Sequence, residues 1–112
     1  MSERVAVGSV GDFADGARKS VEIAGREVTV VRLGDRFTAV WNRCPHSNGR
    51  LMDGVIADGV VTCPLHRWKF DLFTGRTLRD RFLAATVWPV VVEAGTVFVV
   101  FDPPGPSVPP GN

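Results

Sequence analysis

The stretch RCPHSNGRLMDGVIADGVVTCPLHRWKFDLFTGR, residues 43–76, decides how the rest of the chain is interpreted. It contains both cysteines and both histidines of the protein, arranged as two short motifs, Cys44-Pro45-His46 and Cys63-Pro64-Leu65-His66. Sixteen residues separate the two motifs. Each motif supplies one thiol and one imidazole, and a proline after each cysteine restricts the loop backbone. The pattern indicates two similar loops that present metal ligands.

Short segments with the character of β-strands lie on both sides of these motifs. Asp58-Gly59, between two such segments, is a strong signal for a tight hairpin. No window of eleven or more residues has helical periodicity, and only 82–85 is expected to form a brief helical turn. The predicted class is all-β, a small antiparallel sandwich or barrel of short strands. β-Branched and aromatic residues between glycine and aspartate turns predict strands over 5–10, 20–24, 27–33, 36–41, 55–56, 60–62, 69–72, 76–78, 86–93 and 96–101.

The two motifs each follow a predicted strand, so a rigid sheet is expected to hold both loops at its edge. The hairpin between them would bring the loops face to face. We therefore expect one domain over 1–102, with the two ligand loops in a subdomain at about 42–80. Residues 103–112 hold five of the eight prolines. That Pro/Gly-rich composition predicts a disordered tail.

Composition narrows the class of protein. At 112 residues the chain has room for one modest core. Hydrophobic residues make up 45% of it and charged residues 22%, which is an ordinary composition for a soluble globular protein. The net charge of +1 argues against a nucleic-acid partner. The N-terminus has no signal-peptide pattern, and no run approaches the about 18 apolar residues of a membrane span. These features predict a cytoplasmic protein without a membrane partner.

Three interpretations of the cysteines and histidines remain open from the residues alone. They could be unliganded, although their complete segregation into paired motifs is unusual. They could hold a structural zinc ion, for which two cysteines and two histidines are a legitimate tetrahedral set. They could also hold a [2Fe–2S] cluster, with the cysteines on one iron and the histidines on the other.

The spacing C-P-H-x₁₆-C-P-L-H resembles the motif of Rieske iron–sulfur domains, C-x-H followed about sixteen residues later by C-x-x-H. The likeness extends through Gly54, the Asp58-Gly59 turn and residues 68–75, and covers most of 3–101. The resemblance implies a Rieske-type fold and a [2Fe–2S] cluster. It further implies that Cys44 and Cys63 ligate the inner iron, and that His46 and His66 ligate the outer iron near the surface.

The resemblance also implies a potential near the low end of the Rieske range of roughly −150 to +300 mV. High-potential members join the two loops by a disulfide, and the corresponding positions here are Gly49 and Leu65. They also donate a serine and a tyrosine hydroxyl to the cluster sulfurs, where this chain has Trp68 and Phe70. Fewer hydrogen bonds to sulfur stabilise the reduced state less.

Protein side chains would occupy all four ligand positions of the cluster, so no position is left for a substrate. No G-x-G-x-x-G follows a strand, so the usual motif for binding NAD(P)H is absent from the sequence. We therefore expect an electron-transfer component of a multi-component oxidoreductase, not an enzyme on its own. The favoured function is a ferredoxin that relays single electrons from a flavin-containing reductase to a terminal oxygenase, such as a dioxygenase. The alternative is the small subunit of an NAD(P)H-dependent nitrite reductase, bound to its large subunit, which residues 63–72 resemble. A zinc-stapled interaction module is a third hypothesis.

Overall fold

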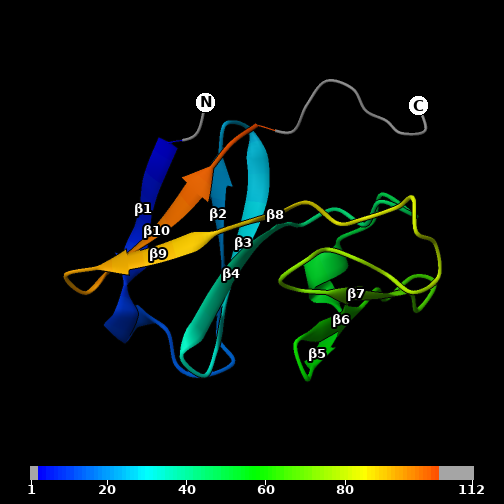
Figure 1. Ribbon diagram of the computed structural model, residues 1–112, viewed down its shortest axis with the longest axis horizontal. Helices are drawn as coiled ribbons and strands as arrows, with labels where there is room; N and C mark the ends of the chain where they lie inside the picture. The colour runs from blue at the N-terminus through cyan, green and yellow to red at the C-terminus, as the bar shows by residue number, and fades with distance from the viewer. Residues whose placement is uncertain (1–2, 104–112) are drawn as a thin grey trace. The chain divides into compact units, whose positions relative to one another are not determined.

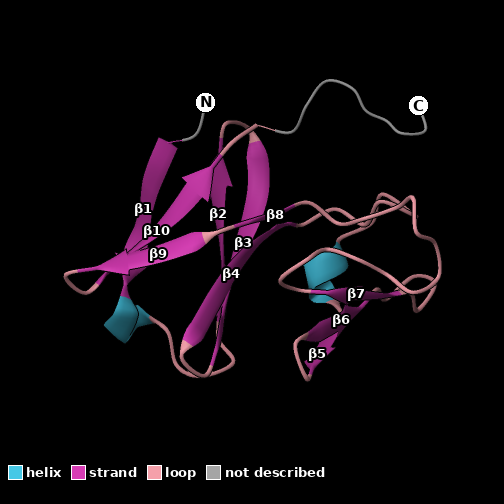
Figure 2. Cartoon of the chain, viewed as in Figure 1, coloured by secondary structure: helices cyan, strands magenta, loops and turns pink. Residues whose placement is uncertain are grey.

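The computed structural model describes residues 3–103, and within that range the regular structure is ten β-strands and two short 3₁₀ helices (Figures 1 and 2). Every pair of strands whose register is resolved runs antiparallel. The predicted all-β class is confirmed. In chain order the elements are β1 (Glu3–Ser9), η1 (Val10–Asp12), β2 (Arg18–Ile23), β3 (Arg26–Leu33), β4 (Arg36–Trp41), η2 (Leu51–Asp53), β5 (Val55–Ala57), β6 (Val60–Thr62), β7 (Lys69–Asp71), β8 (Val87–Trp88), β9 (Val90–Glu93) and β10 (Thr96–Phe101).

The strands form three sheets, ordered β1-β10-β9, β2-β3-β4-β8 and β5-β6-β7. Two-residue turns with positive φ at both positions connect three of the hairpins. Such turns match the right-handed twist of the strands and require residues that tolerate positive φ, which explains the glycine at each second position. The three turns are Ala24-Gly25, Asp58-Gly59 and Ala94-Gly95.

By contacts, the described chain divides into two compact units, one of residues 3–39 and 88–103 and the other of residues 40–87. The first unit has an apolar core in which Trp88 of β8 packs on Phe101 of β10, with ring centroids 5.0 Å apart. The second unit has its own core around Val61, Phe70 and Leu72, all of them buried. All four candidate ligands belong to this second unit. The predicted domain boundaries stay a prediction, and most of the predicted tail, 104–112, lies outside the described residues.

Pro89 divides the predicted strand 86–93 into two. Residues 87–88 form β8 in one sheet, and residues 90–93 form β9 in another. Proline has no N–H to donate to a neighbouring strand, so it suits a position where the chain leaves one sheet for the next. Its carbonyl oxygen still accepts a hydrogen bond from Val100, 2.9 Å long.

Two local predictions are wrong. The predicted strand 76–78 is reduced to an isolated bridge between Arg76 and Ala84, because the Thr77 hydroxyl accepts the N–H of Arg79 and turns the chain. The predicted helical turn at 82–85 does not form. The backbone of Ala85 instead donates to Gly75, so this segment pairs with a distant residue and not with itself.

Candidate metal centre

The two cysteine–histidine motifs fold into backbone loops of the same shape. In the first loop, Cys44 N–H donates to Gly49 O and Asn48 N–H donates to Cys44 O, at 2.9 and 2.7 Å. In the second loop, Cys63 N–H donates to Trp68 O over 2.7 Å, and Arg67 N–H donates to Cys63 O over 2.9 Å. As predicted, each loop directly follows a strand, β4 in one case and β6 in the other. Two similar sequence motifs therefore become two matched ligand loops.

Each loop needs one residue with left-handed backbone to close. Asn48 has φ +62° and Arg67 has φ +61°, at equivalent places in the two loops. Asparagine tolerates this conformation comparatively well, whereas an arginine there is strained.

The two cysteines are fully buried and are free thiols. Burial on its own raises the pKa of the Cys63 thiol, but hydrogen bonds from the backbone N–H groups of Leu65 and His66 and from the side chains of Cys44 and Ser47 lower it, and the net pKa lies below its ordinary value. The loop thus favours the thiolate, which is the form that binds iron.

The two histidines are exposed and adjacent. The ring centroids of His46 and His66 are 4.9 Å apart, with the rings perpendicular. Trp68, which is half-buried, stacks on His46 with centroids 4.0 Å apart and an interplanar angle of 17°. The guanidinium carbon of Arg79 lies 5.3 Å from the Trp68 ring centroid on a cation–π contact. Trp68 therefore covers one of the candidate ligands.

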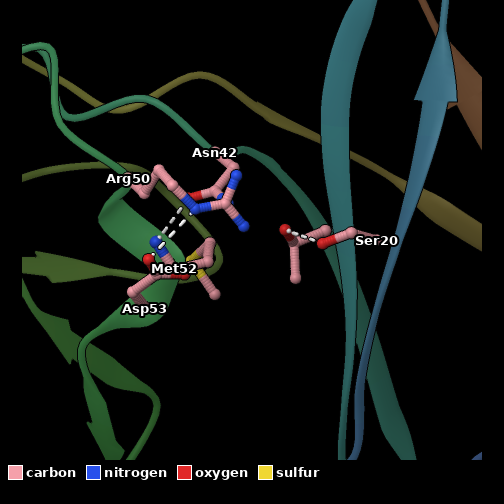
Figure 3. Close-up of polar contacts among 6 residues, drawn as sticks. Ser20, Asn42, Arg50, Met52 and Asp53 are labelled. Atoms are coloured by element: carbon pink, nitrogen blue, oxygen red, sulfur yellow. Dashed lines mark hydrogen bonds and ion pairs between the residues drawn. The ribbon is translucent and has the colours of Figure 1, made fainter.

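A buried asparagine anchors the segment between the loops. The backbone N–H of Met52 in η2 donates to Oδ1 of Asn42 over 2.7 Å, and this contact is drawn as a dashed line in Figure 3. Figure 3 also shows Arg50 paired with Asp53 across the same short helix, 3.0 Å apart. Met52 and Leu51 are buried. Asn42, directly after β4, thereby holds η2, the helix that follows the first loop.

The two positions that a disulfide would occupy in high-potential Rieske proteins lie against each other. A Cβ atom built on Gly49 would lie 2.5 Å from Cδ1 of Leu65. The absence of a side chain on Gly49 therefore lets the Leu65 side chain lie across it. The sequence had placed these two residues opposite each other only through the family resemblance.

Sequence reasoning missed one group close to the thiols. The hydroxyl of Ser47 is 3.7 Å from Sγ of Cys63 and also accepts the N–H of Gly49 over 3.3 Å. Ser47 directly follows the first motif, and this position was the only available signal. The loops therefore do place a hydroxyl beside a candidate sulfur ligand, though not at Trp68 or Phe70.

The donor set fits a two-iron cluster. Across residues 3–103 no three His, Cys, Asp or Glu side chains gather so as to hold a single metal ion. A [2Fe–2S] cluster of mixed ligation needs only two protein ligands on each iron. Two buried thiols and two adjacent, exposed imidazoles would provide those pairs.

Comparison with known proteins identifies the class. Residues 3–92 match the family model of the Rieske [2Fe-2S] domain. The ferredoxin component of the alkene monooxygenase system of Xanthobacter autotrophicus is 31% identical over 102 residues, which cover 90% of this chain and 84% of that protein. The protein belongs to the Rieske [2Fe-2S] domain family.

Solved structures agree. The ferredoxin of carbazole 1,9a-dioxygenase from Nocardioides aromaticivorans is 31% identical, with a TM-score of 0.78 over 87% of this chain and 96% of that one. A complex of reduced oxygenase and oxidised ferredoxin in carbazole 1,9a-dioxygenase matches at 28% identity and a TM-score of 0.78, over 87% of this chain and 92% of that one. A Mycobacterium tuberculosis protein described as an NADH-dependent nitrite reductase small subunit has a TM-score of 0.80 at 23% identity, covering 92% and 98% of the two chains. That last likeness is one of fold.

No helix among the described residues is long and apolar enough to cross a membrane.

Proposed function

We propose that this protein is a Rieske ferredoxin, a carrier of single electrons from a flavin-containing reductase to a terminal oxygenase. Cys44 and Cys63 would hold the inner iron of a [2Fe–2S] cluster, and His46 and His66 the outer iron. When bound, the cluster supplies one-electron oxidation and reduction without a substrate site. The cytoplasm stays the predicted location.

The observation that carries this proposal is the division of the two loops into a buried and an exposed pair. Both thiols have no solvent exposure, whereas both imidazoles are exposed and 4.9 Å apart. A carrier needs its cofactor held away from water on one side and open to a partner on the other. The histidine edge provides the open side.

The relatives support the oxygenase assignment over the alternative. Ferredoxin components of oxygenase systems match at 31% identity over most of both chains. The nitrite reductase subunit shares the fold at lower identity. The alternative keeps one observation in its favour, the sequence of residues 63–72, and it predicts a tight complex with a large subunit.

Reconstitution tests this function. The protein is mixed with NADH, a flavin-containing reductase and a terminal oxygenase, and substrate oxidation is followed with and without the protein. We expect product formation only in its presence, because the cluster is the sole link between the flavin and the oxygenase. Equal turnover without it would contradict the proposal, and co-purification with a sirohaem protein would favour the alternative.

The Ser47 hydroxyl is expected to raise the reduction potential. A thiolate ligand has no proton, so the hydroxyl must donate, and a hydrogen bond to sulfur stabilises the more negative, reduced state. Ser47→Ala should lower the potential by about 40 mV, if the bond is worth about 1 kcal/mol. A redox titration followed by circular dichroism measures this shift, with Ser47→Thr, which retains the hydroxyl, as the matched control. An unchanged or raised potential in Ser47→Ala would show that the hydroxyl does not donate to the cluster sulfur.

A further inference from the structure

A cationic hollow lies beside the second ligand loop. Its volume is about 670 Å³. Four basic side chains line it, and the carboxylate of Asp71 is the one acidic group in the lining. We call this site the basic hollow, and its cationic residues are Arg67, Lys69, Arg76 and Arg79.

The positive charges of the hollow outnumber the one negative charge in its lining. Across residues 3–103, none of the four takes part in an ion pair. Oδ1 of Asp71 accepts the backbone N–H groups of Phe73 and Thr74, at 2.8 and 3.0 Å, so this carboxylate stabilises the turn that follows β7. An excess of unpaired positive charge in a concave surface produces a focused positive potential.

The hollow has a rigid floor. Lys69 and Asp71 lie two residues apart on β7, and therefore on the same face of the strand, while Phe70 between them is buried on the other face. β7 is hydrogen-bonded to β6, with Val60 opposite Asp71, and Val60 also lines the hollow. Of the four cations, Lys69 is therefore held by a sheet, and the other three lie on the segments before and after β7.

Arg67 occupies its position at an energetic cost. A non-glycine residue with φ near +60° is destabilised relative to the ordinary helical conformation, a cost that glycine avoids. Strain of this kind is concentrated at functional positions. The strained backbone therefore makes the long cationic side chain of Arg67 a candidate functional group.

The basic hollow borders the exposed histidine edge. Arg67 directly follows His66 in the second loop. Arg79 lies over the ring of Trp68, and Trp68 stacks on His46. A molecule bound in the hollow would therefore contact Arg67, the chain neighbour of His66, and Arg79, which is linked to His46 through the ring of Trp68.

We infer that the basic hollow docks an acidic surface segment of the redox partner protein. This inference rests on the proposed function, since it names the chemistry of the partner in electron transfer. Charge complementarity orients such encounters and raises their rate. Two exposed apolar side chains favour a protein over a small anion: Leu78 in the lining is fully exposed, and Leu65 in the second loop is 59% exposed. Apolar side chains beside a charged site are typical of a protein interface.

The experiment uses the peptide acetyl-Glu-Glu-Leu-Glu-Glu amide, titrated onto the cluster-loaded protein and followed by NMR chemical shifts. Its glutamine counterpart is the neutral control. We expect the acidic peptide to bind and the neutral one not to bind, and we expect the affinity to fall as salt is raised. Equal binding of the two peptides would overturn the inference.

Charge reversal locates the binding site. Arg76→Glu combined with Arg79→Glu should weaken peptide binding about tenfold, because two attractions become repulsions. Arg18→Glu combined with Arg36→Glu makes the same change in net charge on exposed residues of β2 and β4 outside the hollow. Equal weakening by the two double variants would overturn the inference, because overall charge would then explain it.

Arg67→Gly provides a variant that is expected to fold. It removes a cation and relieves positive-φ strain, so it should weaken peptide binding without lowering the melting temperature. Unchanged binding in Arg67→Gly would argue against the hollow. Displacement of the peptide by inorganic phosphate at equal concentration would reassign the hollow to small anions. The cluster spectrum is recorded separately, so loss of the cluster, which would count against the proposed function, is distinguishable from loss of peptide binding.

Discussion

Cys63→Ser should abolish the visible absorption of the purified protein and the EPR signal of its reduced form. Cys63 has no solvent exposure, and hydrogen bonds within the loops lower the pKa of its thiol below the ordinary value. A serine hydroxyl stays protonated at neutral pH and is a poor ligand for iron in such a cluster. One of the two ligands proposed for the inner iron would be lost, and the cluster with it.

The matched control for this variant is Leu65→Ala in the same loop. Leu65 is largely exposed and is not a proposed ligand, so its removal should leave the absorption spectrum in place. Far-ultraviolet circular dichroism reports whether each variant is folded. A folded Cys63→Ser protein with a full complement of native cluster would mean that the ligand assignment is wrong.

Gly54→Ala should destabilise the protein by about 3 kcal/mol, through overpacking against the backbone. Gly54 has an ordinary φ of −80°, so its backbone conformation does not require glycine. The requirement is steric, because a Cβ atom there would overlap the carbonyl oxygen of Thr62, the residue before Cys63. The strand that leads into the second ligand loop would have to shift. Thermal unfolding should show a fall in melting temperature of more than about 10 °C.

Gly11→Ala is the corresponding control for a glycine with free space. A Cβ atom on Gly11 would meet only the Ser9 hydroxyl, 3.9 Å away. We expect its melting temperature to stay within about 3 °C of the parent protein. Equal melting temperatures for Gly54→Ala and Gly11→Ala would show that the approach of Gly54 to Thr62 is not a constraint.

Much of the fold was predictable because short stretches of sequence determine its turns and strands. The Asp58-Gly59 turn indicates a hairpin, and the β-branched and aromatic residues of 96–101 indicate a strand, both without reference to distant contacts. The wrong predictions concern segments whose conformation is set by contacts with residues elsewhere in the chain. Thr77 is β-branched and Leu78 is apolar, which suits a strand, but the Thr77 hydroxyl and the hydrogen bond from Ala85 to Gly75 set the conformation of 76–78.

The pairing of the two loops was predictable from the sequence, and their surroundings were less so. The type and spacing of Cys44, His46, Cys63 and His66 indicated two similar loops, and their assignment as cluster ligands stays a prediction. The contact of Ser47 with Cys63 and the position of Arg79 over Trp68 join residues from separate segments, and no local pattern encodes them. The conformation of Arg67 was also not predictable, since arginine, unlike glycine or asparagine, does not indicate a positive φ.

Mössbauer spectroscopy of the ⁵⁷Fe-loaded, oxidised protein tests the central claim most directly, because it reports the ligands of each iron separately. If the two thiols hold one iron and the two imidazoles the other, the spectrum should resolve two iron sites of equal intensity with different isomer shifts. His66→Ala should perturb one of those sites first. A single iron environment, or metal analysis that finds one zinc ion per chain and no iron, would contradict the account.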